Sequence, residues 1–328
     1  MKSVQAEKLD SVDDYRMVEI DIPAVASGDV LVQVATCGMG YVDALIALGR
    51  YQVKPPLPFV PGQEIGGTVV ATGEGVQTVR HGDRVMAFGF GGGLAEYVAA
   101  KENMVARIPD AMTMEEAAIF RTNYLTALHG LVDRAAIAAG ECMLVFGSAG
   151  GVGTAAIQIG RILGAEIIAA ASTETKRAFA LANGAQQTID TEPDGWRDRL
   201  KALCDRQGPT VVFDPVCGPL FEPAFRAQAW GGRHLVVGFA GGLIPRLPVN
   251  LSLMKGAALL GVDVRQFQLF EPGRTRGHLI RLLEWVEEGR LSPPVGKIFP
   301  FGDYAAAMTH GLSGTGSGKA VVRISDDL

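Results

Sequence analysis

The sequence predicts an α/β protein in which a doubly wound parallel sheet is joined to a β-rich domain. Residues 30–37 alternate apolar and polar side chains, and the chain around them is rich in Gly and Pro, as expected for half-buried strands joined by turns. Residues 110–192 contain no Pro and alternate short apolar strands with helices. Such alternation indicates parallel strands joined by crossover helices, so a domain boundary is expected near residue 118.

The strand and helix pattern defines each element of the parallel domain. Apolar runs predict strands at 142–146, 166–172, 186–189, 210–214, 233–239 and 257–263, and the segments between them predict helices at 151–163, 174–183, 195–204 and 219–229. After residue 264 we expect a helix at 278–289 and strands at 293–301 and 319–324 that return to the first domain. The expected domains are therefore 1–118 with 265–328, and 119–264.

Composition limits the kind of protein this is. Gly supplies 42 of 328 residues, about 13% against roughly 7% in average proteins, while 48% of the residues are hydrophobic. The apolar content excludes a disordered linker, and the absence of a three-residue Gly period excludes collagen. The excess glycine therefore serves tight turns and close backbone approaches in a folded protein.

Charge indicates a small-molecule protein. The net charge is −5 and no run of five like charges occurs, which argues against nucleic-acid binding or a polybasic membrane anchor. Residues 142–160 carry no charge, but their five glycines and Ser148, Thr154 and Gln158 suit a strand, a turn and a helix better than a membrane span. Residues 1–16 resemble no targeting segment, so a cytoplasmic location is expected.

A glycine-rich turn is the most informative motif. Gly147, Gly150 and Gly153 follow an apolar strand directly and open a helix, which is the context that a dinucleotide-binding turn requires. There the glycines allow a tight turn and close approach of the backbone to a pyrophosphate at the helix N-terminus. The candidate ligands of the pyrophosphate are Gly147, Ser148, Ala149, Gly150, Gly151 and Val152.

The end of the second strand indicates which dinucleotide binds. An NAD enzyme places Asp or Glu there, roughly 20 residues past the turn, but position 172 is Ser, and Lys176 and Arg177 follow. A hydroxyl and a cation suit the 2′-phosphate of NADPH. The alternative is that Lys176 and Arg177 form an ordinary solvated first helical turn, and Glu174 leaves that alternative open.

Several motifs together carry a family resemblance. They lie at 28–43, 61–76, 82–88, 123–131, 231–242 and 316–322, besides the glycine turn. With them the sequence resembles the zinc-independent quinone oxidoreductase branch, related to zeta-crystallin, of the medium-chain dehydrogenase/reductase superfamily. The resemblance implies a GroES-like catalytic domain built from both chain ends, a Rossmann NADPH-binding domain, a cofactor cleft at their junction, and a homodimer or homotetramer.

The same resemblance implies that no metal is bound. The three positions that hold catalytic zinc in other members are Gly40, Gln63 and Thr122 in this chain, and the cysteines of the structural zinc lobe are missing. The five histidines are too dispersed to indicate another site. Without a Lewis acid, the expected chemistry is hydride transfer from NADPH to an electrophile such as a quinone, enone, enal or enoyl thioester.

The resemblance also implies site residues. The candidate catalytic residues are Tyr51, Asp43 and Asn123, and Tyr51 is either a proton donor or a wall of the substrate pocket. Besides the glycine turn, Ser172 and Lys176, the candidate cofactor residues are Thr126, Gly238, Phe239, Ala240 and Lys319. Cys217 replaces a family glycine near the cofactor, as either a reactive or an inert buried thiol. The other cysteines, Cys37, Cys142 and Cys204, form no C-x-x-C pair and are expected to be buried.

Three functions fit these observations. The first is an NADPH:quinone reductase or ene-reductase. The second is an enoyl-thioester, acryloyl-CoA or 2-alkenal reductase, for which Arg50, Lys54, Arg265 and Arg274 are candidate contacts to a phosphate-bearing carrier. The third is an NADPH-binding structural or regulatory protein without turnover.

Overall fold

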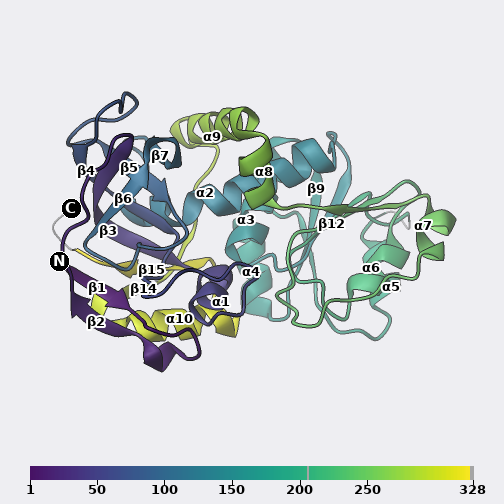
Figure 1. The fold of residues 1–328 in the computed structure, drawn as a ribbon. Helices are drawn as coiled ribbons and strands as arrows, with labels where there is room; N and C mark the ends of the chain where they lie inside the picture. The colour runs from purple at the N-terminus through teal and green to yellow at the C-terminus, as the bar shows by residue number, and fades with distance from the viewer. Residues whose placement is uncertain (205–206, 326–328) are drawn as a thin grey trace. The chain divides into compact units, whose positions relative to one another are not determined.

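The computed structural model describes residues 1–204 and 207–325 (Figure 1). The chain divides into two compact units. The first contains Met1–Arg121 and the described residues from Val286 onward, and the second contains Thr122–Trp285. Each unit has its own main sheet.

The first unit is β-rich. Its main sheet has the strand order β14-β15-β3-β4-β5-β7, with β6 also paired to β3, and β1 pairs with β2 in a separate ribbon. The strands are β1 (Lys2–Gln5), β2 (Arg16–Glu19), β3 (Asp29–Met39), β4 (Glu64–Thr72), β5 (Arg84–Phe88), β6 (Tyr97–Lys101), β7 (Val105–Arg107), β14 (Val295–Pro300) and β15 (Lys319–Arg323). The helices are α1 (Tyr41–Ala47) and α10 (Tyr304–Ser313), with 3-10 turns at Val12–Asp14, Glu102–Met104 and Phe301–Asp303.

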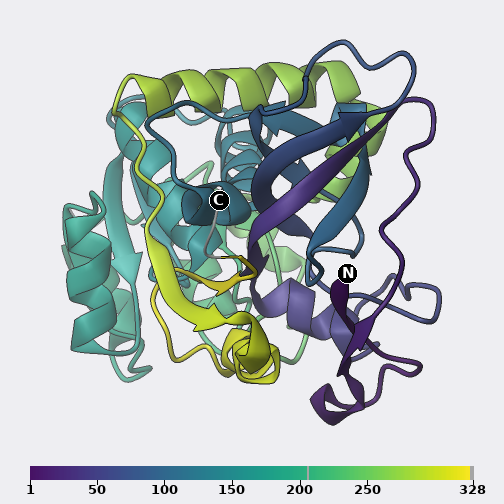
Figure 2. The ribbon, with the colours of Figure 1, turned by 90° about the vertical axis from the view of Figure 1, so that its left-hand side faces the viewer.

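Both parts of the chain build this unit. Strand β15 lies antiparallel to β3, with Val321 opposite Gly38 and Val322 opposite Cys37. Figure 2 shows the yellow C-terminal segments in the same unit as the purple and blue N-terminal strands. Alternate residues of β3 and β15, such as Val32, Val34 and Val322, are fully buried in one apolar core. Burial of these side chains is what holds the two chain segments together.

The second unit is a doubly wound parallel sheet. Its strand order is β10-β9-β8-β11-β12-β13, and every pair is parallel. The strands are β8 (Cys142–Val145), β9 (Glu166–Ala170), β10 (Gln187–Ile189), β11 (Val211–Asp214), β12 (Arg233–Val236) and β13 (Ala258–Gly261). In chain order this is 3-2-1-4-5-6, the Rossmann arrangement. The predicted fold class is confirmed, and each strand expected in this domain is present, although all six are shorter than the sequence predicts.

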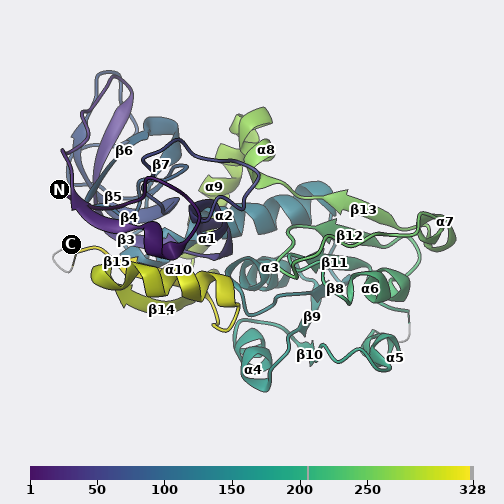
Figure 3. The ribbon, with the colours of Figure 1, turned by 60° about the horizontal axis from the view of Figure 1, so that its bottom comes forward.

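Helices cover both faces of that sheet. Figure 3 shows α3 (Gly151–Ile162) and α4 (Glu174–Ala182) on one face, and α5 (Trp196–Ala202) and α6 (Phe221–Ala227) on the other. Three further helices follow, α7 (Asn250–Lys255), α8 (Val264–Phe270) and α9 (Pro272–Glu287). None of the described helices combines the length and the apolar character that a membrane span requires.

A histidine and carboxylate cluster fixes α8 and α9 to the second unit. Helix α2 (Met114–Leu128) continues into a π-helical turn at His129–Arg134. The Asp133 carboxylate lies 2.8 Å from Nδ1 of His129 and 2.7 Å from Nε2 of His278 on α9, and the His129 ring stacks on Phe267 of α8 at 3.9 Å. Burial alone would raise the pKa of Asp133, but these hydrogen bonds outweigh it and lower that pKa.

The cluster bears on the expected domain boundary. The sequence assigns residues 265–328 to the catalytic domain, whereas the compact units place 265–285 with the parallel sheet. The second unit ends at Trp285. Phe267 and His278 precede this boundary and pack on the π-helical turn of the second unit, which accounts for the difference. The catalytic role of the segment stays a prediction.

A buried ion cluster stabilises the first unit. The ammonium of Lys319 on β15 lies 2.6 Å from the Glu64 carboxylate on β4 and 3.3 Å from the Asp43 carboxylate on α1. Asp43 and Glu64 are 3% and 1% exposed. Burial by itself disfavours the charged lysine, but the two carboxylates outweigh this effect and raise the pKa of Lys319 above its usual value. Lys319 therefore neutralises part of the negative charge that these two buried carboxylates carry.

We predict that Lys319→Met lowers the free energy of unfolding by about 3–5 kcal/mol, because it removes the ammonium group that two buried carboxylates contact. Urea denaturation followed by circular dichroism measures this change. Since the pKa of Lys319 is raised in the folded protein, its contribution to the free energy of unfolding is complete below pH 10.5. That contribution is lost as the pH rises above this value.

The matched control is Lys297→Met on the neighbouring strand β14, where the exposed ammonium lies 4.7 Å from the centre of the Phe299 ring. This variant is expected to change the free energy of unfolding by less than about 1 kcal/mol. Equal effects of the two substitutions would show that the ion cluster does not stabilise the unit.

Candidate cofactor and substrate site

The glycine turn is closed by contacts that exclude side chains. Gly147 has a φ of +56°, in the left-handed region, and a Cβ at Gly153 would lie 2.3 Å from the Gly147 carbonyl oxygen. A Cβ at Gly151 would lie 2.4 Å from Nδ2 of Asn123 on α2. A side chain at position 153 would displace helix α3 from the turn, which is why the motif needs glycine there.

The N-terminus of α3 offers backbone donors to an anion. Its N-cap is Gly150, which supplies no side-chain hydrogen bond to the first turn. The first N–H groups of a helix have no acceptor within the helix, and the helix dipole favours negative charge there. A pyrophosphate is the ligand that such a turn and helix start accommodate in Rossmann domains.

The Ser148 side chain has a role within the turn itself, and the contact of this residue with the cofactor stays a prediction. Its side chain is fully buried, and its hydroxyl donates a 2.9 Å hydrogen bond to the Ala170 carbonyl at the end of β9. The Ser148 carbonyl in turn accepts a hydrogen bond from the Thr154 hydroxyl at 3.2 Å. The Ser148 side chain thus fixes the turn to the sheet, and contact with a phosphate is left to the backbone.

Cationic side chains follow β9, as the sequence predicts. Ser172 is exposed, Thr173 caps α4 by accepting from the Lys176 N–H, and Lys176 is half-buried. Arg177 donates from Nη1 to the Ala171 carbonyl at 3.0 Å, so its guanidinium lies at the end of β9. Arg177 is absent from the predicted ligand set, although its place beside Lys176 is the signal that would have included it.

A buried carboxylate organises the turn after β11. Asp214, which is 1% exposed, accepts hydrogen bonds from the Val216 and Cys217 N–H groups at 2.9 and 2.7 Å. Its second oxygen lies 3.1 Å from Nε2 of His234 on β12, so one carboxylate connects two strands and a turn. The sequence contains no pattern that reveals this pair, since its members lie on different strands.

The turn after β11 holds the loop after β12. Ala240 donates to the Pro215 carbonyl at 3.2 Å, and Gly241 donates to the Val216 carbonyl at 2.8 Å. The carboxyl ends of parallel strands lie along one edge of a sheet. The structure therefore brings Gly238, Phe239 and Ala240 to the same sheet edge as the glycine turn and the residues after β9.

Cys217 lies in this turn as a buried thiol. It is 1% exposed, its Sγ lies 3.6 Å from the Asp214 carbonyl, and burial raises the pKa of the thiol above its usual value. Its φ of +46° is in the left-handed region, where the family motif has glycine. These observations favour the inert of the two interpretations, because a reactive cysteine needs an accessible thiolate.

The predicted residues on α2 belong to the second unit. The Asn123 amide packs against Gly151 at the start of α3, and Thr126 is buried one turn further on. Tyr124 between them donates from its hydroxyl to Oε1 of Gln158 at 2.8 Å and so ties α2 to α3. Asn123 and Thr126 are thereby fixed relative to the glycine turn.

The predicted residues of the first unit are the ion cluster and Tyr51. Asp43 accepts from the Gly40 N–H at 2.9 Å and the Gln63 N–H at 3.2 Å, besides its contact with Lys319. A Cβ at Gly40 would lie 3.1 Å from Cε of Lys319, so the lysine chain fills the space beside this position. Tyr51 is half-buried and packs on the apolar core. The sequence missed Glu64, although it directly follows Gln63 at the motif that holds zinc in relatives.

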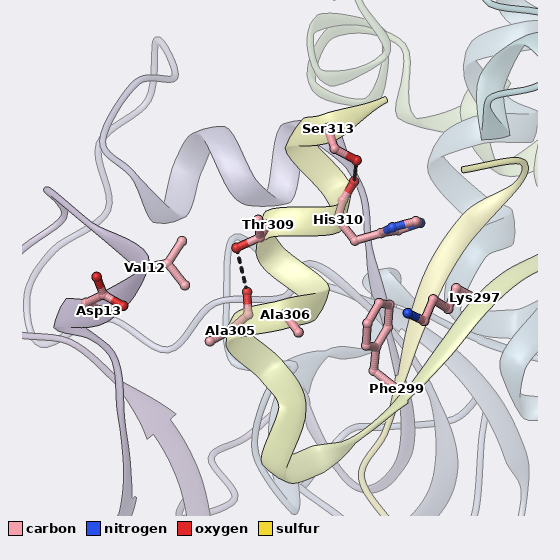
Figure 4. Close-up of a pocket in the computed structure, with 9 residues that line it drawn as sticks. All are labelled: Val12, Asp13, Lys297, Phe299, Ala305, Ala306, Thr309, His310 and Ser313. Atoms are coloured by element: carbon pink, nitrogen blue, oxygen red, sulfur yellow. Dashed lines mark hydrogen bonds between the residues drawn. The ribbon is translucent and has the colours of Figure 1, made fainter. Parts of the chain in front are cut away.

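Among the described residues, no group of three or more His, Cys, Asp or Glu side chains is arranged to hold a metal ion. A pocket of about 580 Å³ on the first unit (Figure 4) contains no predicted site residue. It is lined by Val12, Asp13, Lys297, Phe299, Ala305, Ala306, Thr309, His310 and Ser313. The candidate cofactor residues of the second unit lie instead at the carboxyl edge of its parallel sheet, and the first unit carries Asp43 and Tyr51 as candidates of its own.

Comparison with known proteins identifies the family. Residues 26–110 match the model of the alcohol dehydrogenase GroES-like domain, and residues 151–284 match that of the zinc-binding dehydrogenases. The quinone oxidoreductase-like protein 2 of Bos taurus is 34% identical over 307 residues, which cover 93% of this chain and 88% of the relative.

Solved structures agree with that similarity. A probable oxidoreductase from Mycobacterium abscessus has a TM-score of 0.89 at 33% identity, covering 99% of both chains. The quinone oxidoreductase from Thermus thermophilus, also solved in complex with NADPH, has a TM-score of 0.85 at 32% identity and covers 99% of this chain and 100% of that one. The chain therefore belongs to the zinc-independent, quinone oxidoreductase-like branch of the medium-chain dehydrogenase/reductase superfamily.

Proposed function

We propose that this protein is an NADPH-dependent oxidoreductase that transfers a hydride to a quinone or to an activated C=C bond. The observation that carries the proposal is the glycine turn at the start of α3, with cations and no carboxylate directly at the end of β9. Family membership supports it, and so does the Thermus thermophilus relative solved with NADPH.

Each group at the sheet edge has a task in this proposal. The backbone of Gly147–Val152 binds the pyrophosphate, and Ser172, Lys176 and Arg177 bind the 2′-phosphate, because cations and a hydroxyl attract a dianion that a carboxylate would repel. Asn123, Thr126 and Gly238–Ala240 position the nicotinamide. NADPH supplies the hydride when it is bound, and Asp214 with His234 keeps the neighbouring loops in register.

The first unit supplies the groups on the substrate side. Asp43 already accepts two backbone hydrogen bonds and contacts the Lys319 ammonium, so its carboxylate positions the chain around Gly40. The Lys319 ammonium is already paired with the carboxylates of Asp43 and Glu64. We therefore propose that Lys319 balances their charge and does not bind the cofactor directly. Tyr51 remains the candidate proton donor, with the pocket wall as its alternative role.

A quinone fits the surroundings better than a carrier-bound thioester. Of the four basic residues that would meet a carrier phosphate, Arg265 pairs with Asp263 at 3.8 Å and Arg274 with Glu271 at 3.0 Å. The carboxylates of Asp263 and Glu271 offset the positive charge of the two arginines, which a carrier phosphate would need for binding. Arg50 and Lys54 are exposed on the first unit and keep the enoyl-thioester reductase as the second candidate.

We predict that the protein oxidises NADPH with 1,4-benzoquinone faster than with acrylyl-CoA, as followed by NADPH absorbance.

In the same assay Tyr51→Phe should lower turnover of enone substrates by about tenfold or more while NADPH affinity is kept, because only the proton donor is lost. Unchanged turnover would make Tyr51 a wall residue. Tight NADPH binding without turnover of any quinone, enone or enal would support the structural or regulatory alternative.

We predict that Lys176→Ala weakens NADPH binding by about tenfold or more and leaves NADH binding unchanged, since a charge-assisted hydrogen bond contributes roughly 1.5–3 kcal/mol. Fluorescence titration with both nucleotides measures the two affinities. Lys255→Ala, at the end of α7 in the same unit, serves as the control. Equal loss of NADPH and NADH affinity would show that Lys176 does not read the 2′-phosphate.

We further propose a homodimer in which β13 takes part. This strand forms one edge of the parallel sheet and carries Leu259, which is 44% exposed, and the segment between β12 and β13 carries Leu243 at 89% and Leu253 at 82%. Unpaired strand edges and exposed apolar side chains are features of association surfaces. A monomer mass in solution would contradict the proposal, and Leu253→Glu is expected to shift a dimer toward monomer. The cytoplasmic location stays a prediction.

A further inference from the structure

Two cysteines outside the candidate site lie unusually close together. The Sγ atoms of Cys142 and Cys204 are 3.1 Å apart, and no disulfide joins them. Cys142 is the first residue of β8, and Cys204 follows the end of α5 at Ala202. A disulfide has a sulfur separation of about 2.05 Å, so bond formation needs a movement of only about 1 Å.

Backbone hydrogen bonds hold both cysteines in place. The Cys142 carbonyl accepts from the N–H of Thr210 at 2.9 Å and from its hydroxyl at 3.2 Å. The Cys204 N–H donates to the Lys201 carbonyl at 3.1 Å, and the Cys204 carbonyl accepts from the Gln207 N–H at 2.9 Å. Both side chains also pack in the apolar cluster that contains Trp196 and Leu200. The two sulfurs are therefore preorganised for each other.

The other two thiols lack this arrangement. The sulfurs of Cys37 and Cys217 lie 3.7 and 3.6 Å from backbone carbonyls, and burial raises the pKa of each thiol. Cys142, by contrast, is only half-buried, so we expect it to be the thiol that a small reagent reaches first. Oxidation should therefore be selective for the pair.

We propose that Cys142 and Cys204 are a site of reversible oxidation, at which a low-molecular-weight disulfide such as glutathione disulfide converts the two thiols into an intramolecular disulfide. The Cys142 thiolate attacks one sulfur of the reagent, forms a mixed disulfide and releases one glutathione thiolate. The Cys204 thiolate then attacks the Cys142 sulfur and releases the second. Two protein thiols are oxidised, one reagent disulfide is reduced, and the two thiol protons pass to the released glutathiones.

The position of the pair predicts the consequence of oxidation. Cys142 is the first residue of β8, and the glycine turn follows the last residue of that strand. The two therefore lie at opposite ends of β8, roughly 15 Å apart at the rise of an extended strand. The disulfide would close a chain segment with a sequence separation of 62 and would restrict the unfolded state. Oxidation should therefore raise the unfolding temperature and leave NADPH binding unchanged.

The test incubates the folded full-length protein with glutathione disulfide, blocks remaining thiols, and maps the peptides by mass spectrometry. The expected result is loss of two of the four thiols, a peptide pair linked through Cys142 and Cys204, and recovery of four thiols on reduction. The unfolding temperature of the oxidised protein should rise, and its titration with NADPH should match that of the reduced protein.

The variant Cys204→Ser separates the two steps. It is expected to keep one glutathione on Cys142 and to show no increase in unfolding temperature, whereas Cys217→Ala should form the disulfide as the wild type does. Three results for the wild type after incubation with glutathione disulfide would each overturn the proposal. They are four intact thiols, glutathione retained on Cys142, and a different linked peptide pair. The wild-type peptide map decides the question even where a variant fails to fold.

Discussion

The close approach of helix α3 to the glycine turn is the constraint on which the candidate site depends. The backbone at Gly153 lies against the Gly147 carbonyl, where even a methyl group would come within 2.3 Å of the oxygen. This contact places the start of α3 directly behind the end of β8, and it sets the direction of the first N–H groups of the helix. The position of Asn123 against Gly151 depends on the same contact.

Buried carboxylates extend this order beyond the turn. Asp214 binds the backbone after β11 and contacts His234, and in the first unit Asp43 and Glu64 surround the Lys319 ammonium. In each case the charge is met by N–H donors or by a cation, which is the condition for burying it. Asp43 also stays a candidate catalytic residue. These groups fix the backbone of the loops that are proposed to contact cofactor and substrate.

The sequence predicted those features that depend on residues close together in the chain. Apolar runs and the three glycines identified the six strands, the turn and the start of α3, because each signal lies within a few residues. Contacts between distant residues left no such signal. Glu64 and Lys319 are 255 positions apart, and Asp133 meets His278 across 145 positions, so neither pair was found. Likewise, the sequence cannot show that the Ser148 hydroxyl donates a hydrogen bond to the Ala170 carbonyl.

The central claim is that the bare backbone of the glycine turn holds the pyrophosphate of NADPH. The most direct test is the NADPH affinity of Gly153→Ala, measured by fluorescence titration beside Gly160→Ala. At Gly160 in the same helix, a Cβ would meet only flexible side-chain ends, Cε of Met143 at 2.5 Å and Cδ1 of Ile167 at 3.3 Å. The account predicts that Gly153→Ala loses NADPH affinity by at least about tenfold while Gly160→Ala keeps it. Full affinity in a folded Gly153→Ala protein would contradict it.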